Sequence, residues 1–333
     1  MTGPAKAVFV KDLKPKDTVR TSFLVKSKEI LFNKNGKAYL ALTLADKTGE
    51  LDCRAWNDAE TFNQAFQEGD VVAVGGKLGV FQNKTQLSLD HLVPLEPHEY
   101  QLDDYLPQSD ENLDSLYSEL IQVFQGLENP WIKKLGLDLL EDPEIAKRYK
   151  VCPAAKTIHH AFIGGLLCHS LQLIKLVEAI LPLYSGVSRD LLIFGAAFHD
   201  FGKIYELQYD GKFGYTDEGR LVGHIAIGIS LVDRKIQAIS GFPKDLENHL
   251  KHLILSHHGK LEHGSPKTPH TLEAEILHWL DHMDSRINSI QNHLQQETLP
   301  SGWTTFHKAY GTFFLRTASF EMPNEKTCAI PLS

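Results

Sequence analysis

The stretch Ala197-Phe198-His199-Asp200-Phe201-Gly202-Lys203 decides how the second half of this 333-residue chain is expected to fold. It closes the apolar run 189–198, whose hydrophobic residues recur at helical spacing. A histidine and a carboxylate therefore stand side by side where a buried helix ends. Both side chains ligate metals, and the two oxygens of Asp200 can each take one ion. The stretch predicts a metal site inside a helical domain.

More histidines and acids follow outward from this pair, each on another segment with helical periodicity. Histidine is also unevenly distributed, because 15 of the 17 lie after residue 158. Several helices can therefore aim such side chains into one interior pocket. The candidate metal ligands, in chain order, are His169, His199, Asp200, His224, His257, His258 and Asp281.

These candidates are too many for one tetrahedral zinc ion, which takes four ligands. Two divalent ions bridged by Asp200 account for them better. Nitrogen and carboxylate ligands suit Mn²⁺, our first choice, or Fe²⁺, Co²⁺, Ni²⁺ or Zn²⁺. Two neighbouring ions clamp the attacking and leaving oxygens of a phosphoryl displacement. Five other histidines are expected on solvated faces or in support of the ligands, namely His249, His252, His278, His282 and His293. His263 and His270 are left undecided.

The first half of the chain has the residue pattern of a β-barrel. Segments rich in Val, Leu, Thr and aromatic residues are separated by turn signals, and a short helical pattern at 57–66 divides the third from the fourth. This layout predicts an OB-fold, which commonly binds single-stranded nucleic acid. The five predicted strands are 18–32, 37–46, 49–56, 70–81 and 85–95.

The predicted chain is therefore multidomain, a β-barrel followed by an all-α domain. The OB-fold domain is expected over 1–98, a proline-containing acidic linker over 99–111 and the helical domain over 112–333. The metal core of the helical domain is expected at about 155–290. An Asp-Gly turn between aromatic segments in 204–220 predicts a small inserted β-hairpin.

Candidate substrate contacts lie around the first hairpin of the barrel. Lys34 and Lys37 stand at its tip, where a cation can reach backbone phosphates. Phe32 and Tyr39 are candidate base-stacking residues, with a place in the barrel core as the open alternative. Trp56 is expected in the core.

Charge and composition limit the classes of partner. The net charge is -8, divided into about +1 for residues 1–98 and -9 for the rest. Phosphate contacts need Lys and Arg, but divalent ions bound in the acidic half would offset its charge, so nucleic acid is not excluded. The apolar run 191–198 is too short to cross a bilayer, the start of the chain has no apolar signal region, and the four cysteines show no CxxC pair. We expect a cytoplasmic protein with no membrane partner.

The order His, His-Asp, His, His-His, Asp resembles the HD-domain superfamily of metal-dependent phosphohydrolases over about residues 155–290. More specific runs are GGLLCHS at 164–170, SHHGKLEHGSP at 256–266 and DHMDSR at 281–286. With the predicted OB-fold, the whole chain is similar to the YhaM-type 3'-to-5' exoribonuclease family. The GYP sequence of cyclic-di-GMP phosphodiesterases is absent, which argues against that branch.

The resemblance implies a metal-dependent enzyme that shortens single-stranded RNA from the 3' end to nucleoside 5'-monophosphates, with single-stranded DNA as an additional candidate substrate. We hypothesise that a metal-activated water attacks the terminal phosphodiester and that Lys203 stabilises the charge that develops. His160 and Arg286 are candidate substrate contacts. Asp284 is expected to orient Arg286 or a metal-bound histidine. One ion is assigned to His169, His199, Asp200 and Asp281, and the other to Asp200, His224, His257 and His258.

Two rival functions stay open on the sequence. The first is a phosphohydrolase of small nucleotides in which the barrel serves regulation or assembly, since a fold does not select a substrate. The second is a non-catalytic nucleic-acid-binding protein, against which the near-complete ligand set speaks. The sequence also leaves open the choice between RNA and DNA, the physiological metal and whether the chain forms homo-oligomers.

Overall fold

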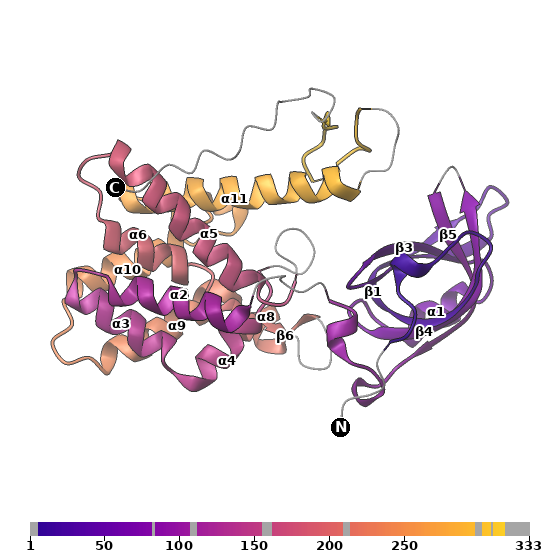
Figure 1. The fold of residues 1–333 in the computed structure, drawn as a ribbon, viewed down its shortest axis with the longest axis horizontal. Coiled ribbons are helices and arrows are strands. Elements are labelled where there is room, and N and C mark those ends of the chain that lie inside the picture. Colours follow the sequence, from indigo (N-terminus) through magenta and orange to yellow (C-terminus); the bar gives the residue numbers. More distant parts are fainter. Residues whose placement is uncertain are drawn as a thin grey trace.

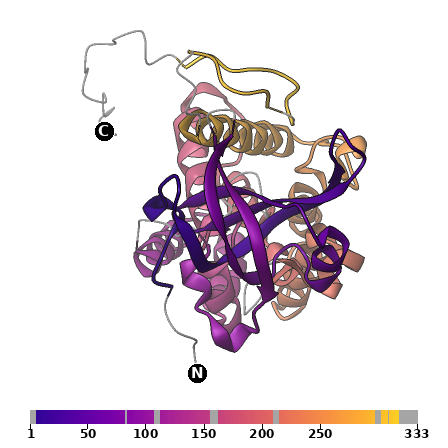
Figure 2. The ribbon, with the colours of Figure 1, turned by 90° about the vertical axis from the view of Figure 1, so that its right-hand side faces the viewer.

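The computed structural model describes residues 6–81, 84–106, 112–154, 162–208, 214–296, 302–307 and 309–316. It consists of an N-terminal β-barrel and a C-terminal group of helices (Figure 1). Turned by 90°, the barrel lies in front of the helices (Figure 2). The predicted fold class, a small barrel followed by a helical domain, is confirmed.

The barrel is closed by five strands in the order β1-β2-β3-β5-β4. Strands β3 and β5 run parallel, and the other neighbours are antiparallel. The short helix α1, Ala59–Ala65, connects β3 to β4 as predicted. The strands are β1 Thr18–Phe32, β2 Ala38–Asp46, β3 Gly49–Ala55, β4 Val71–Phe81 and β5 Lys84–Pro94.

Alternation along the strands builds the barrel core. Leu40, Leu42 and Leu44 of β2 all point inward and are buried. The pairing of β4 with β5 shifts register between Gly75 and Gly76. A Cβ on Gly76 would lie 2.2 Å from the backbone oxygen of Ser88, so only glycine allows the two strands to approach at this bulge.

The segment treated as a linker in the sequence is packed against the barrel as far as residue 106. The 3-10 turn Pro97–Glu99 leads into it, and it contains the 3-10 turn Leu102–Asp104. Tyr100, Tyr105 and Leu106 are buried in a cluster with Leu24 and Val71 of the barrel. This part of the segment is therefore an extension of the barrel and not a free tether.

The helical domain is built around one large apolar core. Helix α5, with α6 beside it, lies at the centre and also contacts α2, α4 and α11. By length and composition alone, the stretch Gly165–Leu183 could cross a membrane, but most of its apolar residues are covered by the neighbouring helices. The helices are α2 Leu113–Gln125, α3 Pro130–Leu140, α4 Pro143–Val151, α5 Gly165–Ile180, α6 Arg189–Phe198, α7 Lys203–Glu206, α8 Asp217–Val222, α9 His224–Gln237, α10 Lys244–Ser256 and α11 Leu272–Gln296.

The predicted inserted hairpin is present between α7 and α8. Its strands are β6, Leu207–Gln208, and β7, Gly214–Tyr215, which pair antiparallel. After α11, residues 302–307 pair antiparallel with residues 309–316 through bridges of Trp303 with Leu315 and of His307 with Thr312.

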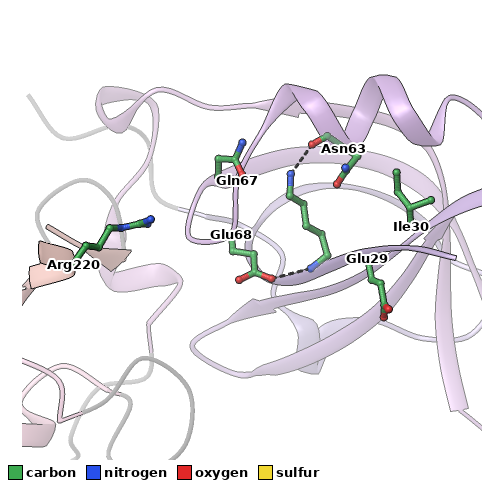
Figure 3. Close-up of a pocket in the computed structure, with 7 residues that line it drawn as sticks. Glu29, Ile30, Asn63, Gln67, Glu68 and Arg220 are labelled. Carbon is green, nitrogen blue, oxygen red and sulfur yellow. Dashed lines mark hydrogen bonds between the residues drawn. The ribbon is translucent and has the colours of Figure 1, made fainter. Parts of the chain in front are cut away.

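A cavity of about 390 Å³ lies where α8 faces the barrel. Arg220 of α8 extends toward Glu68 across this space (Figure 3). On the barrel side, the backbone N–H of Lys28 donates to Glu68 Oε1 at 3.3 Å. The lining residues are Lys28, Glu29, Ile30, Asn63, Gln67, Glu68 and Arg220. The surfaces of the two parts that face each other here are therefore polar and of mixed charge.

Candidate metal centre

The seven predicted ligands come from five places in the helical domain and meet at one point. His169 lies on α5, His199 and Asp200 directly follow α6, His224 opens α9, His257 and His258 follow α10, and Asp281 lies on α11. His169, His199, Asp200 and His257 are buried. Burial of so many polar groups in an apolar core is costly unless each has a partner.

Two overlapping groups within this set have the spacing of metal ligands. One atom from each of His169, His199 and Asp200 can be chosen so that all lie within 4.8 Å of one another. Asp281 adjoins this first group, because its Oδ1 lies 3.2 Å from His169 Nε2 and 3.7 Å from His199 Nε2.

The second group consists of Asp200, His224, His257 and His258, again within 4.8 Å of one another. Asp200 therefore belongs to both groups, as the sequence predicted. The structure brings all seven residues together, and their division between two ions stays a prediction.

Atoms without partners mark the position that a cation would take. Among the described residues, Asp200 Oδ1, His224 Nε2 and His257 Nε2 are buried and make no hydrogen bond. They nevertheless converge, since Asp200 Oδ1 is 3.3 Å from His224 Nε2 and 3.5 Å from His257 Nε2. A buried polar atom without a partner costs about 1–3 kcal/mol. A divalent cation would satisfy all three, so these residues fit a metal.

The outer nitrogen of each histidine ligand has an oxygen acceptor. The Nδ1 atoms of His199, His257 and His258 lie 3.1, 2.8 and 3.1 Å from backbone carbonyl oxygens. Nδ1 of His169 is 2.8 Å from Asp284 Oδ2, so Asp284 orients a predicted metal ligand. With Nδ1 as the donor, each ring in its neutral form keeps an Nε2 lone pair for the pocket.

The charges of the pocket favour a cation. Burial raises the pKa of Asp200, but Lys203 and His199 outweigh this effect and hold it well below its usual range. Burial lowers the pKa of His169, yet Asp281 and Asp284 raise it to about 9, so without a metal this side chain keeps its proton near neutral pH. Burial, reinforced by His257, lowers the pKa of His258 to about 4. A metal would therefore meet the ionised carboxylate of Asp200 and the neutral imidazole of His258.

Lys203 holds the shared carboxylate from outside. Its Nζ donates to Asp200 Oδ2 at 2.7 Å and to the backbone oxygen of Ala154 at 2.7 Å. Burial lowers the pKa of Lys203, but Asp200 raises it above its ordinary value, so the side chain stays charged. Its predicted contact with a substrate phosphate stays a prediction. His160, another candidate substrate contact, lies outside the described residues.

Arg286 points to a different part of the molecule. Its guanidinium lies over the ring of Tyr310, 4.4 Å from the centroid, in the segment that follows α11. Asp284, two residues earlier, is buried against His169, whereas Arg286 is exposed. A helix places such neighbours on different faces, so Arg286 lies away from the side that Asp284 presents to the pocket.

The candidate nucleic-acid contacts gather at one end of the barrel. The side chain of Phe32 is 71% exposed at the end of β1, and the exposed Lys37 donates from Nζ to Asn57 Oδ1 at 2.7 Å. Lys34 is exposed in the adjoining turn. Their predicted contacts with a nucleic acid stay predictions.

The expectation that Trp56 belongs to the core is wrong, because its side chain is 42% exposed. It follows the buried Ala55, and alternation along the strand turns it outward. Outside, its ring lies 4.8 Å from that of Tyr39, which is partly buried. The pair forms an aromatic surface beside the first hairpin.

Glu206 contacts a ligand of the candidate metal centre, and the sequence did not predict this contact. It is buried at the end of α7 and accepts from His224 Nδ1 at 3.2 Å. Nothing in its spacing marks it, because the contact depends on how closely α7 approaches α9. Gly202 permits this approach, since a Cβ there would lie 1.9 Å from the backbone oxygen of His224.

Family models match both parts of the chain. Residues 24–95 match the OB-fold nucleic acid binding domain model, and residues 166–286 match the HD domain model. Among solved structures, the second OB-fold domain of replication protein A from Methanococcus maripaludis aligns with 26% of this chain and 92% of its own length. The identity is 23% and the TM-score is 0.22, too low to carry an argument.

Curated proteins named 3'-5' exoribonuclease YhaM match most of the chain. The protein from Bacillus pumilus is 32% identical over 87% of this chain and 91% of its own length. The protein from Bacillus subtilis is 33% identical over 82% and 86%, and that from Listeria innocua is 32% identical over 84% and 88%. The similarity thus runs through the barrel and the helices that carry the ligands. By this shared length and arrangement, the chain belongs to the YhaM family of 3'-5' exoribonucleases.

Proposed function

We propose that this protein is a metal-dependent exoribonuclease that hydrolyses single-stranded RNA from its 3' end and releases nucleoside 5'-monophosphates. The observation that carries the proposal is the convergence of two ligand groups on Asp200, with three buried atoms that lack partners among the described residues. The direction and the RNA substrate come from the names of the relatives.

We assign one ion to His169, His199, Asp200 and Asp281 and the other to Asp200, His224, His257 and His258, with Mn²⁺ as the first choice. Bound ions supply a water of lowered pKa and positive charge beside the phosphate.

The chain's own residues hold this arrangement in place. Lys203 fixes the carboxylate of Asp200 through the 2.7 Å contact of its Nζ with Oδ2. Its charge, next to the shared ligand, also stabilises negative charge that develops on a substrate phosphate. The carboxylates and carbonyls on the Nδ1 atoms keep the histidine rings oriented, so no reorganisation of the ligands is needed during the reaction.

We propose that the barrel holds the strand upstream of the pocket. Phe32 and the Tyr39–Trp56 pair offer faces on which successive bases can stack, and Lys34 and Lys37 offer charge for the backbone phosphates. Such contacts are made to base faces and phosphates, which single-stranded DNA also presents, so we include it as a second substrate.

We also propose a cytoplasmic location. It is supported by the free thiols of Cys53, Cys152 and Cys168, which a reducing compartment would keep in that state.

Hydrolysis of a 5'-labelled single-stranded RNA with added Mn²⁺ tests the proposal. We expect a ladder of fragments shortened from the 3' end, and a rate at least about 100-fold lower for Asp200→Ala. Asp190→Asn is the matched control, because Asp190 is a buried carboxylate whose Oδ2 accepts from the backbone N–H of Asn129 at 2.6 Å, between α3 and α6. Full activity of Asp200→Ala would overturn the metal assignment. Hydrolysis of mononucleotides in preference to RNA would favour the rival function.

A further inference from the structure

Glu206 makes two hydrogen bonds to a single residue of the second ligand group. Its Oε1 accepts from the ring Nδ1 of His224 at 3.2 Å and from the backbone N–H of the same residue at 3.0 Å. His224 is the first residue of α9, and the preceding Gly223 provides no side-chain cap. One carboxylate oxygen therefore caps α9 and sets the rotation of the imidazole ring.

Backbone contacts fix both ends of this bond. A Cβ on Gly219 would lie 2.3 Å from the backbone oxygen of Glu206, and the N–H of Thr216 donates to that oxygen at 3.0 Å. At the other end, Gly202 packs directly against the backbone of His224. The backbones that carry the carboxylate and the ring are thus held in place by the packing of α7, α8 and α9.

The chemistry of the bond prepares His224 for a metal. Donation from Nδ1 to a carboxylate leaves the lone pair on Nε2, the atom that faces Asp200 Oδ1 at 3.3 Å without a hydrogen bond among the described residues. The negative charge also makes Nε2 a stronger ligand. Asp284 plays the same part for His169, so each ligand group has one histidine backed by a carboxylate.

We propose that Glu206 is a positioning residue that sets the metal affinity of the group formed by Asp200, His224, His257 and His258. The inference rests on the proposed function, because it requires that this group binds an ion. On this proposal, Glu206 and the packing of α7 and α8 set the affinity for one of the two ions. Asp284 on α11 sets the affinity for the other.

Titration of the metal-free full-length chain with Mn²⁺, followed by the loss of the free Mn²⁺ electron paramagnetic resonance signal, tests this assignment. We expect two bound ions in the wild type. In Glu206→Ala one ion should bind about 10- to 100-fold more weakly and the other unchanged. Glu206→Gln keeps an oxygen acceptor but removes the charge, so its loss should be smaller than that of Glu206→Ala. In Asp284→Asn the other ion should weaken.

A double-mutant comparison separates positioning from a general structural effect. In the His224→Ala background, Glu206→Gln should change neither of the two Mn²⁺ affinities. The imidazole through which Glu206 acts on the metal is then absent. Asp190→Asn, the buried carboxylate away from the pocket, should leave both affinities unchanged. Unchanged affinities in a folded Glu206→Ala protein, checked by circular dichroism, would overturn the role of Glu206 and leave the proposed function intact. A wild type that binds no ion would overturn both.

Discussion

Lys203 Nζ and Asp200 Oδ2 lie 2.7 Å apart in the largely buried heart of the helical domain. The carboxylate that both ligand groups share is therefore held by a fixed cation, while its other oxygen is left for the metal side. This contact, together with the bond from Lys203 to the backbone oxygen of Ala154, defines the orientation of the shared carboxylate.

Replacement of Lys203 should lower the rate of the chemical step more than substrate binding. We expect Lys203→Met to reduce kcat by about 100-fold, because a positive charge next to the reacting phosphate is lost, while KM changes little. Single-turnover cleavage of labelled RNA measures the step directly. Lys203→Arg, which keeps the charge, should recover part of the rate, and equal losses in both variants would contradict the electrostatic role.

Metal affinity should depend on pH through the first ligand group. The pKa of His169 is raised to about 9, so an ion must displace a proton there at every pH below that value. Affinity of this group should therefore rise about tenfold per pH unit up to pH 9 and then level off. The pKa values of His257 and His258 are lowered, so the second group should vary little between pH 7 and pH 9.

Competition of Zn²⁺ between the protein and a chelator, measured at several pH values, checks this difference. One steep and one flat affinity profile are expected. Asp284→Asn removes one of the charges that hold the proton on His169, so the steep profile should level off at a lower pH. Two flat profiles in the wild type would refute the assignment.

Trp56→Ala should weaken the binding of single-stranded RNA without unfolding the barrel. Loss of one stacked base costs about 1–3 kcal/mol, and the side chain is already 42% exposed. Fluorescence anisotropy with labelled oligonucleotides gives the dissociation constant. Trp303, which lies beyond α11 and is 54% exposed, provides the matched control. An equal effect of Trp303→Ala would contradict a specific stacking role for Trp56.

The two lysines of the first hairpin should contribute to the salt dependence of binding. Each contact with a phosphate of a single strand adds about 0.7 to the slope of log affinity against log salt. Lys34→Gln with Lys37→Gln should therefore reduce the slope by about 1.4. Binding measured over a series of NaCl concentrations tests this number. An unchanged slope would show that Lys34 and Lys37 do not contact the phosphates of the strand.

Gly202→Ala should disturb the centre through packing alone. A Cβ at this position would lie 1.9 Å from the backbone oxygen of His224, so α7 must move away from α9. We expect a loss of about 1–3 kcal/mol in the free energy of unfolding, measured by denaturant titration, together with weaker metal binding. Gly126→Ala is the control, since its nearest contact would be an ordinary 3.4 Å. Equal stability of both variants would contradict this account.

The regular parts of the fold could be predicted because their signals are local. Alternation such as Leu40, Leu42 and Leu44 marks a strand whatever surrounds it, and helical spacing marked the segments that carry the ligands. The order of histidines and acids along the chain was equally informative. Most of them lie at helix ends that caps and turns reveal, and the other two, His169 and Asp281, lie within helices of clear periodicity. The predicted ligands therefore came together in the structure.

The features that sequence reasoning missed depend on contacts between distant segments. Trp56 was expected inside, but alternation after Ala55 places it outside. Tyr100 and Tyr105 lie in a stretch of polar composition, and only their packing against the barrel shows that they are core residues. Glu206 reaches His224 because two glycines let short helices touch, which no spacing in the sequence encodes.

The packing of Tyr100, Tyr105 and Leu106 on the barrel determines where the protein can be divided. A fragment cut at residue 98 would uncover Leu24 and Val71 and lose the hydrogen bond between Tyr105 and Ser22. Such a fragment would expose an apolar face and would be prone to aggregate. An autonomous nucleic-acid-binding module, fit for transplantation onto another enzyme, has to extend through Leu106.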